Sequence, residues 1–291
     1  MKEIAKAIDN AFVAVPEPVR DYLTVKAATV FLELGAGHSL EAGRCRFWGH
    51  EMLERWYRGE STPLSLYATR LFDRSKFDIG CAERFTSGPA IVVINEPSDG
   101  PVRGGWLRFV TSYAVAQARN RFGNFEPRWV QEDISANPLW QTPLGIARKR
   151  LSYMIHESCN TILISSDSTD RKKAGAVLEM RRHLNDNGVL VISPERRDGP
   201  NLSRARVDAG DLIYALCRKN NIPIYPAGGF WQPGRLSLRI GRAVHAQELL
   251  DSKLFRGQSN TGQRVGDLLM VEVAKLLPES KRGIYTKSVG N

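Results

Sequence analysis

The sequence predicts an α/β fold in which a central mixed, mostly parallel sheet is flanked by helices. Residues 91–94 form an unbroken β-branched run, which is typical of a strand buried on both faces. Two more apolar runs, 161–164 and 189–192, lie on either side of a helical pattern over 170–187. Because strand, helix and strand follow one another within about 30 residues, we expect a crossover unit with parallel strands.

The first part of the chain, residues 1–75, is predicted to be a helical region. After a break at the two prolines of 16–18, apolar residues over 19–33 recur at helical spacing and predict an amphipathic helix. The polar face of this helix carries few Lys or Arg residues, which favours packing on the main domain over the alternative of a membrane-surface helix. Shorter helical patterns follow over 47–56 and 64–72.

The second part, residues 76–250, is predicted to be the α/β domain, and the third, 251–291, a helix with a polar tail. Expected strands of the second part cover 77–81, 90–94, 161–164, 189–192, 222–226 and 236–240, and expected helices cover 170–187 and 209–219. The aromatic stretch FWQPG, residues 230–234, is predicted to be a turn between strands. In the third part, a helix is expected over 263–277 and a polar tail over 278–291.

The charge balance favours an anionic partner without choosing one. The chain has 291 residues, with 41 Lys and Arg against 31 Asp and Glu, so its formal net charge is +10. Such an excess attracts nucleic acid, an anionic membrane surface or a phosphorylated substrate. Because the basic residues are dispersed and no nucleic-acid binding motif is present, no nucleic acid is expected as a partner.

The four cysteines, at positions 45, 81, 159 and 217, form no C-x-x-C pair, which argues against a zinc ribbon, a redox motif or a disulfide scaffold. We therefore expect a cytoplasmic protein, either free or peripheral on the inner face of a membrane. The five histidines have no metal-ligand spacing, and no phosphate-binding or dinucleotide-binding glycine motif is present. No metal and no cofactor are expected.

Four blocks of sequence follow one another with the order and spacing of a known family. They read FDIGCAERFTSGPAIVVINEPS, TILISSDSTDRKKAGAVLEMRRHLNDNGVLVISPE, VDAGDLIYALCRKNNIPIYPAGG and LSLRIGRAV. This series resembles the glycerolipid acyltransferases, which acylate glycerol 3-phosphate and lysophosphatidic acid. The resemblance implies a glycerolipid acyltransferase-like fold and a role in phospholipid synthesis. The implied reaction moves an acyl group from acyl-CoA or acyl carrier protein to the hydroxyl of a phosphorylated glycerolipid-type acceptor.

The family's H-x-x-x-x-D motif, in which the histidine takes the acceptor's proton, is degenerate in this chain. Glu96 stands where the histidine would be and Pro101 where the aspartate would be, with Asp99 two residues earlier. The resemblance therefore implies Glu96 as a surrogate base and Asp99 as its partner. Each has an alternative interpretation, Glu96 as a loop carboxylate that accepts backbone N–H groups and Asp99 as a turn residue. A histidine from elsewhere, His38 or His50, stays open as the base.

The family's P-E-G-T-R block reads PERRD here, and it follows a predicted buried strand. Ligands of open α/β sheets collect beyond the carboxyl ends of strands, and an arginine grips a phosphate with two N–H groups. For the arginine pair of this block, a solvated charge pair is the alternative. A catalytically inactive relative that binds lipid, a partner protein or an anionic membrane surface is the alternative for the whole chain. The expected substrate-binding residues are Ser98, Glu195, Arg196, Arg197 and Arg206.

Overall fold

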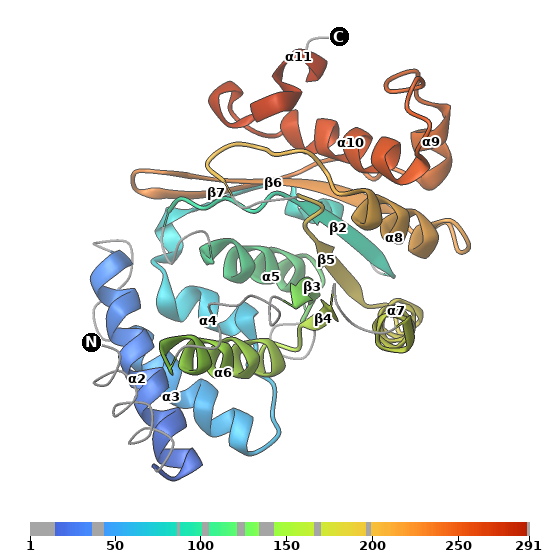
Figure 1. Ribbon diagram of the computed structural model, residues 1–291. Helices are drawn as coiled ribbons and strands as arrows, with labels where there is room; N and C mark the ends of the chain where they lie inside the picture. Colours follow the sequence, from blue (N-terminus) through green and yellow to red (C-terminus); the bar gives the residue numbers. More distant parts are fainter. Residues whose placement is uncertain are drawn as a thin grey trace.

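The computed structural model describes residues 15–36, 44–85, 88–100, 105–120, 126–133, 143–165, 170–195 and 199–289. The strands are β1 (Phe77–Gly80), β2 (Ala90–Ile94), β3 (Arg128–Asp133), β4 (Ile162–Ser165), β5 (Val189–Ile192), β6 (Ile224–Gln232) and β7 (Arg235–Ile240). The helices are α2 (Glu17–Ala36), α3 (Arg44–Tyr57), α4 (Leu64–Leu71), α5 (Trp106–Ala118), α6 (Pro143–Ser158), α7 (Asp170–Asn185), α8 (Val207–Cys217), α9 (Ala246–Asp251), α10 (Thr261–Ala274) and α11 (Thr286–Val289). Helices and strands alternate through the middle of the chain (Figure 1), which confirms the predicted α/β class.

The described strands form one mixed, mostly parallel sheet in the order β1-β7-β6-β2-β5-β3-β4. Strands β6, β2, β5, β3 and β4 run parallel to one another, whereas β7 is antiparallel to β6 and parallel to β1. The chain leaves β2 and β5 in opposite directions, because β2 leads to β3 beyond β5, and β5 leads to β6 beyond β2. At such a reversal, open α/β sheets bind ligands beyond the carboxyl ends of their strands.

Strand β2 is buried on both faces, as its β-branched run predicts. Val92 and Ile94 belong to a core shared with α3, α4 and α5, whereas Ile91 and Val93 belong to a second core shared with α7, α8 and α10. Figure 1 shows α10 and α5 on opposite sides of the sheet. The crossover helices α5 and α8 therefore lie on opposite faces of the sheet.

Helix α2 packs against α3 and α6 through a buried carboxylate. Asp21 on α2 is fully buried, and its Oδ2 accepts a hydrogen bond of 2.8 Å from the hydroxyl of Tyr57 on α3. Arg150 on α6 donates to both oxygens of Asp21, at 3.2 and 3.1 Å, and also to Glu17 at 2.6 Å. A buried charge is tolerated only when it is paired and hydrogen-bonded, so this cluster fixes the angle at which α2 meets α6.

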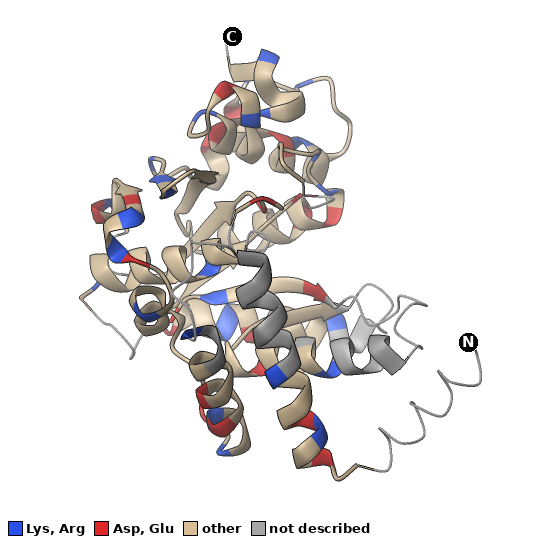
Figure 2. Ribbon diagram, turned by 90° about the vertical axis from the view of Figure 1, so that its left-hand side faces the viewer, with Lys and Arg blue, Asp and Glu red and all other residues tan. Residues whose placement is uncertain are grey.

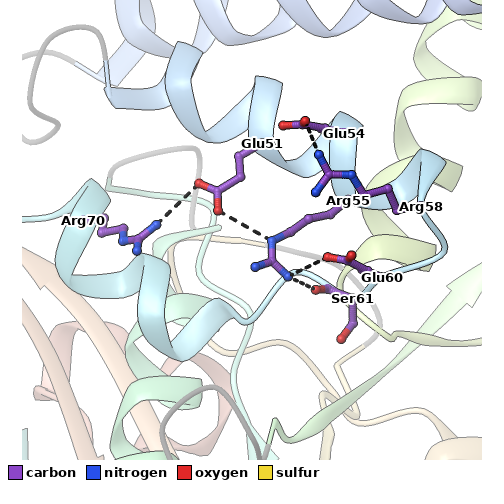
Figure 3. A network of polar contacts seen from close by, with 7 residues as sticks. All are labelled: Glu51, Glu54, Arg55, Arg58, Glu60, Ser61 and Arg70. Carbon is purple, nitrogen blue, oxygen red and sulfur yellow. Dashed lines mark hydrogen bonds and ion pairs between the residues drawn. The ribbon is translucent and has the colours of Figure 1, made fainter.

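A chain of partly exposed polar contacts connects α3 with α4 and with the segment that joins them (Figure 3). Glu51 pairs with Arg55 at 3.6 Å and with Arg70 of α4 at 3.4 Å. Arg55 also reaches Glu60 at 3.4 Å and the carbonyl of Ser61 at 3.1 Å. These contacts join α3 to α4 and to the segment between them, but solvent screens them because the side chains are partly exposed.

Two predictions for the later part of the chain are wrong. Phe230, Trp231 and Gln232 belong to strand β6, so the turn between β6 and β7 consists of Pro233 and Gly234 alone. Gly234 has a φ of +80°, which glycine adopts without strain. Residues 279–289, predicted as a polar tail, instead form two 3₁₀ turns, η7 (Glu279–Lys281) and η8 (Gly283–Tyr285), followed by α11.

The described helices carry mixed charge. Lys and Arg are interspersed with Asp and Glu along them (Figure 2), as the dispersed basic residues of the sequence predict. Among the helices that the structure describes, none has the length and apolar character needed to cross a membrane.

Candidate functional site

The carboxyl ends of three neighbouring strands, β2, β5 and β3, bring two glutamates and a glutamine together. Glu96 follows β2, Glu195 follows β5, and Gln131 lies in β3. The backbone N–H of Glu96 donates to Oε2 of Glu195 at 2.7 Å, and Nε2 of Gln131 lies 3.5 Å from Oε1 of Glu96. Glu96 itself is half-buried.

Asn95 fixes the direction in which the chain leaves β2. Its side chain is buried, donates to the carbonyl of Gly229 at 2.8 Å and accepts from the N–H of Gly229 at 2.7 Å. The amide thus pairs with the backbone of β6 as a neighbouring strand would. Strand β6 also approaches α5 closely at Gly229. A Cβ at this position would collide with the side chain of Leu107, so the approach favours glycine.

Glu195 ties the loop after β2 to the loop after β5. It is 8% exposed, and its two carboxylate oxygens accept from the N–H of Glu96 at 2.7 Å and the N–H of Ser203 at 2.8 Å. Burial raises the pKa of Glu195 to about 7; the two backbone donors lower it, and the charge of Glu96 raises it further. Predicted as a substrate-binding residue, Glu195 uses both oxygens to hold backbone.

Asp99, predicted as the partner of the base, makes its ion pair with the C-terminal segment. Its Oδ2 lies 2.6 Å from Nζ of Lys281, and its backbone carbonyl accepts from the indole of Trp106 at 3.3 Å. Ser98, predicted to bind substrate, is exposed, and its N–H donates to the carbonyl of Gly199 at 3.2 Å. These contacts hold the turn after β2 against its neighbours.

A cleft of about 430 Å³ opens beside this edge, at the start of α8. It is lined by residues 204–208 together with Asp211 and Gln263. Arg206, a predicted substrate-binding residue, donates to Glu132 of β3, and its Nε lies 3.4 Å from Asp208. The backbone N–H of Arg206 donates to the carbonyl of Pro194 at 2.8 Å, so the arginine is fixed to the end of β5.

Several sequence-predicted residues lie outside the described part of the chain. Arg196 and Arg197, the expected acceptor clamp, fall in the gap at 196–198, and Pro101 falls in the gap at 101–104. His38, an alternative base, lies in the gap at 37–43. For these positions the sequence interpretation stays a prediction.

Three histidines that the structure describes have structural contacts elsewhere. The ring of His50 lies 5.1 Å from that of Tyr22, between α3 and α2. His183 Nε2 is 3.0 Å from the carbonyl of Val189, at the start of β5 and therefore at the opposite end of this strand from Glu195. Burial lowers the pKa of His183. His245 is the N-cap of the short helix α9.

Sequence reasoning missed Asn95, Gln131 and the contribution of residues 279–289. Asn95 directly precedes Glu96, so the sequence draws attention to the predicted base and not to its neighbour. Lys281 lies in the stretch predicted as a polar tail. Within the described ranges, no group of three or more His, Cys, Asp or Glu residues is arranged to hold a metal ion.

Comparison with known proteins adds no relative. No protein-family model matches this chain, and no curated protein matches its sequence.

Proposed function

We propose that this chain is a glycerolipid acyltransferase-like enzyme that transfers an acyl group from a thioester donor to the hydroxyl of a phosphorylated acceptor. One observation carries the proposal: Glu96 and Glu195 meet at the carboxyl edge where the chain leaves β2 and β5 in opposite directions. The four sequence blocks that resemble the glycerolipid acyltransferases in order and spacing support the same reaction.

In this proposal Glu96 is the proton acceptor. The acceptor hydroxyl gives its proton to the Glu96 carboxylate while its oxygen bonds to the acyl carbonyl carbon. The carbon–sulfur bond then breaks, and the leaving thiolate takes the proton from Glu96, which returns to its ionised form. Glu195 accepts a hydrogen bond from the backbone N–H of Glu96, with 2.7 Å between that nitrogen and Oε2 of Glu195. Because Glu195 is buried, this contact holds the backbone of the base in one position.

The acceptor's phosphate is assigned to the cleft at the start of α8. Arg206 and Arg204 line this cleft, and the first N–H groups of a helix favour an anion. Arg196 and Arg197 stay predicted phosphate-binding residues, because they lie between Glu195 and Gly199 in the sequence. The acidic neighbours of Arg206 at Glu132 and Asp208 are exchangeable partners, which an incoming phosphate displaces.

The test is acceptor-dependent release of free thiol. Purified full-length protein is mixed with palmitoyl-CoA, with or without lysophosphatidic acid, and thiol is followed with a chromogenic disulfide. We expect release only with both substrates, and a loss of about 100-fold or more for Glu96→Gln. Glu54→Gln, on the exposed side of α3, is the matched control and should stay within about twofold of the wild type. Absence of acceptor-dependent release, or an unchanged Glu96→Gln, refutes the proposal.

A second candidate, binding without catalysis, is favoured by one contact. Asp99 is paired with Lys281 at 2.6 Å and does not orient Glu96, so no acid–base pair forms between the two predicted residues. In this version the protein binds a lipid phosphate or an anionic membrane surface as a peripheral protein. Sedimentation with phosphatidylglycerol vesicles should then show attachment that weakens with salt, and none with phosphatidylcholine. Equal attachment to both vesicles contradicts it.

A further inference from the structure

The C-terminal segment 279–285, which comprises η7 and η8, crosses the loop 199–206 in direct backbone contact. The N–H of Leu202 donates to the carbonyl of Lys281 at 3.0 Å. Gly283 has a φ of +54°, and a Cβ at this position would collide with the carbonyl oxygen of Leu202. This approach is possible only for glycine, so the two stretches are fitted to each other rather than merely adjacent.

A buried hydrogen-bond cluster fastens the same loop at Ala205. Tyr285 is 3% exposed; its hydroxyl accepts from the N–H of Ala205 at 3.0 Å and donates to Oδ1 of Asp267 at 2.7 Å. Gln263 donates both to the carbonyl of Ala205 and to Asp267, each at 3.0 Å. Asp267 is itself buried and also accepts from Gln258 at 2.9 Å. Both polar groups of the Ala205 backbone are therefore held by side chains of α10 and η8.

A second attachment reaches the loop after β2. Nζ of Lys281 lies 2.6 Å from Oδ2 of Asp99, and each of these side chains is about a quarter exposed. Lys281 thus contacts one loop through its backbone and the other through its side chain. A single segment spans the two loops that carry Glu96 and Arg206.

We propose that residues 279–285 are a clamp that, together with Glu195, holds the loop 199–206 beside the loop after β2. Tyr285 and Lys281 are its positioning residues. This inference rests on the proposed function, because it takes the loop 199–206 as the place where the acceptor's phosphate binds. Directional hydrogen bonds to buried backbone fix a loop more closely than apolar packing does, which is the requirement for holding an acceptor at a base.

Hydrogen–deuterium exchange tests the clamp independently of any activity. Tyr285→Phe leaves the Ala205 N–H without its acceptor, and Lys281→Met removes the ion pair from the partly exposed side without disturbing the core. We expect amides in 199–206 to exchange about tenfold faster or more in Tyr285→Phe, and amides of 98–100 to exchange faster in Lys281→Met.

Two control variants remove a tyrosine hydroxyl and a lysine ion pair outside the two loops. Tyr153→Phe removes a hydroxyl that donates to Glu157 at 2.9 Å on α6, and Lys275→Met removes a pair with Glu272 at 2.6 Å on α10. Neither should change exchange in the two loops. If Tyr285→Phe proves unstable, Lys281→Met decides alone, since a partly exposed pair contributes little to folding. Unchanged exchange at both loops, with the variants folded, overturns the clamp.

The KM values for the two substrates then distinguish a positioning role from a general loss of stability. We expect Tyr285→Phe and Lys281→Met to raise the KM for lysophosphatidic acid about fivefold, with the KM for the thioester unchanged, and Lys281→Arg to restore the wild-type value. An equal rise in both KM values overturns the positioning role. If the wild type shows no acyl transfer, the proposed function fails, while the exchange experiment still decides whether the clamp exists.

Discussion

Two glutamates in different regions of the molecule show why a perturbed carboxyl does not by itself define a site. Burial raises the pKa of Glu126, which precedes β3 and contacts the start of α4, to about 7, and it raises the pKa of Glu195, at the sheet edge, to about 7 as well. Glu126 accepts from the N–H and the hydroxyl of Ser65, and so caps a helix that has no cap of its own.

The difference lies in what each glutamate joins. Glu126 connects the stretch before β3 to one helix end, whereas Glu195 connects two loops and has the charge of Glu96 beside it. The sheet edge also has a cleft, a reversal of chain direction and a second carboxylate. Convergence of loops, rather than the size of a pKa shift, therefore marks the candidate site.

The largest expected change in stability comes from Asn95→Ala at the sheet edge. The substitution leaves the buried N–H and carbonyl of Gly229 without partners, each worth about 1–3 kcal/mol, so we expect a loss of about 3 kcal/mol or more. Urea unfolding measures it, with Asn220→Ala in the exposed turn after α8 as the control. A loss below about 1 kcal/mol would mean that this pairing does not hold the edge.

Both glutamates should next contribute to the pH dependence of stability. A carboxyl whose pKa rises from 4.5 to about 7 on folding favours the folded state below pH 4.5, and this advantage disappears as pH rises through 7. Glu195→Gln should remove about 3 kcal/mol of this change between the two pH values. Glu126→Gln should remove a similar amount, because burial raises the pKa of Glu126 to about 7 as well.

Free energies of unfolding measured from pH 4 to 8 test this expectation. If the curve for Glu195→Gln runs parallel to that of the wild type, a raised pKa of this carboxyl is contradicted. A parallel curve for Glu126→Gln would contradict the raised pKa of Glu126 in the same way.

The smallest effect is expected in the exposed network on α3. Arg55→Met removes the contacts with Glu51, Glu60 and the carbonyl of Ser61, but these groups are partly solvated. We expect a loss of about 0.5 kcal/mol, and less at high salt. Arg150→Met, which strands the buried Asp21, is the contrasting variant and should cost several times more. Equal losses for the two arginines would show that exposure is not the deciding factor.

Most of the sheet could be predicted from the sequence, because buried parallel strands leave a local apolar signal. Residues 91–94 and 189–192 are such runs, and the structure places them side by side in β2 and β5. Strand β3 was not predicted, since it reads RWVQED and four of its six residues are polar. A strand that itself contains polar residues lacks the apolar run by which buried strands are recognised.

The site could be predicted only in part, for a similar reason. Glu96 and Glu195 each follow a predicted parallel strand, and the carboxyl ends of parallel strands lie at the same edge of a sheet, so the sequence alone predicts that the two residues share an edge. The pairing of Asp99 with Lys281, 182 residues later, leaves no periodic signal in the sequence. The same holds for Tyr285, whose partner Ala205 lies 80 residues away.

The most direct test of the central claim compares acyl transfer by Glu195→Gln and Glu126→Gln under conditions where both are folded. Glu195→Gln should lower the acceptor-dependent rate about tenfold or more, because an amide cannot accept from both the Glu96 and Ser203 N–H groups. Glu126→Gln should stay within about twofold of the wild type. Equal losses, or a larger loss for Glu126→Gln, would contradict the placement of the site at the carboxyl edge.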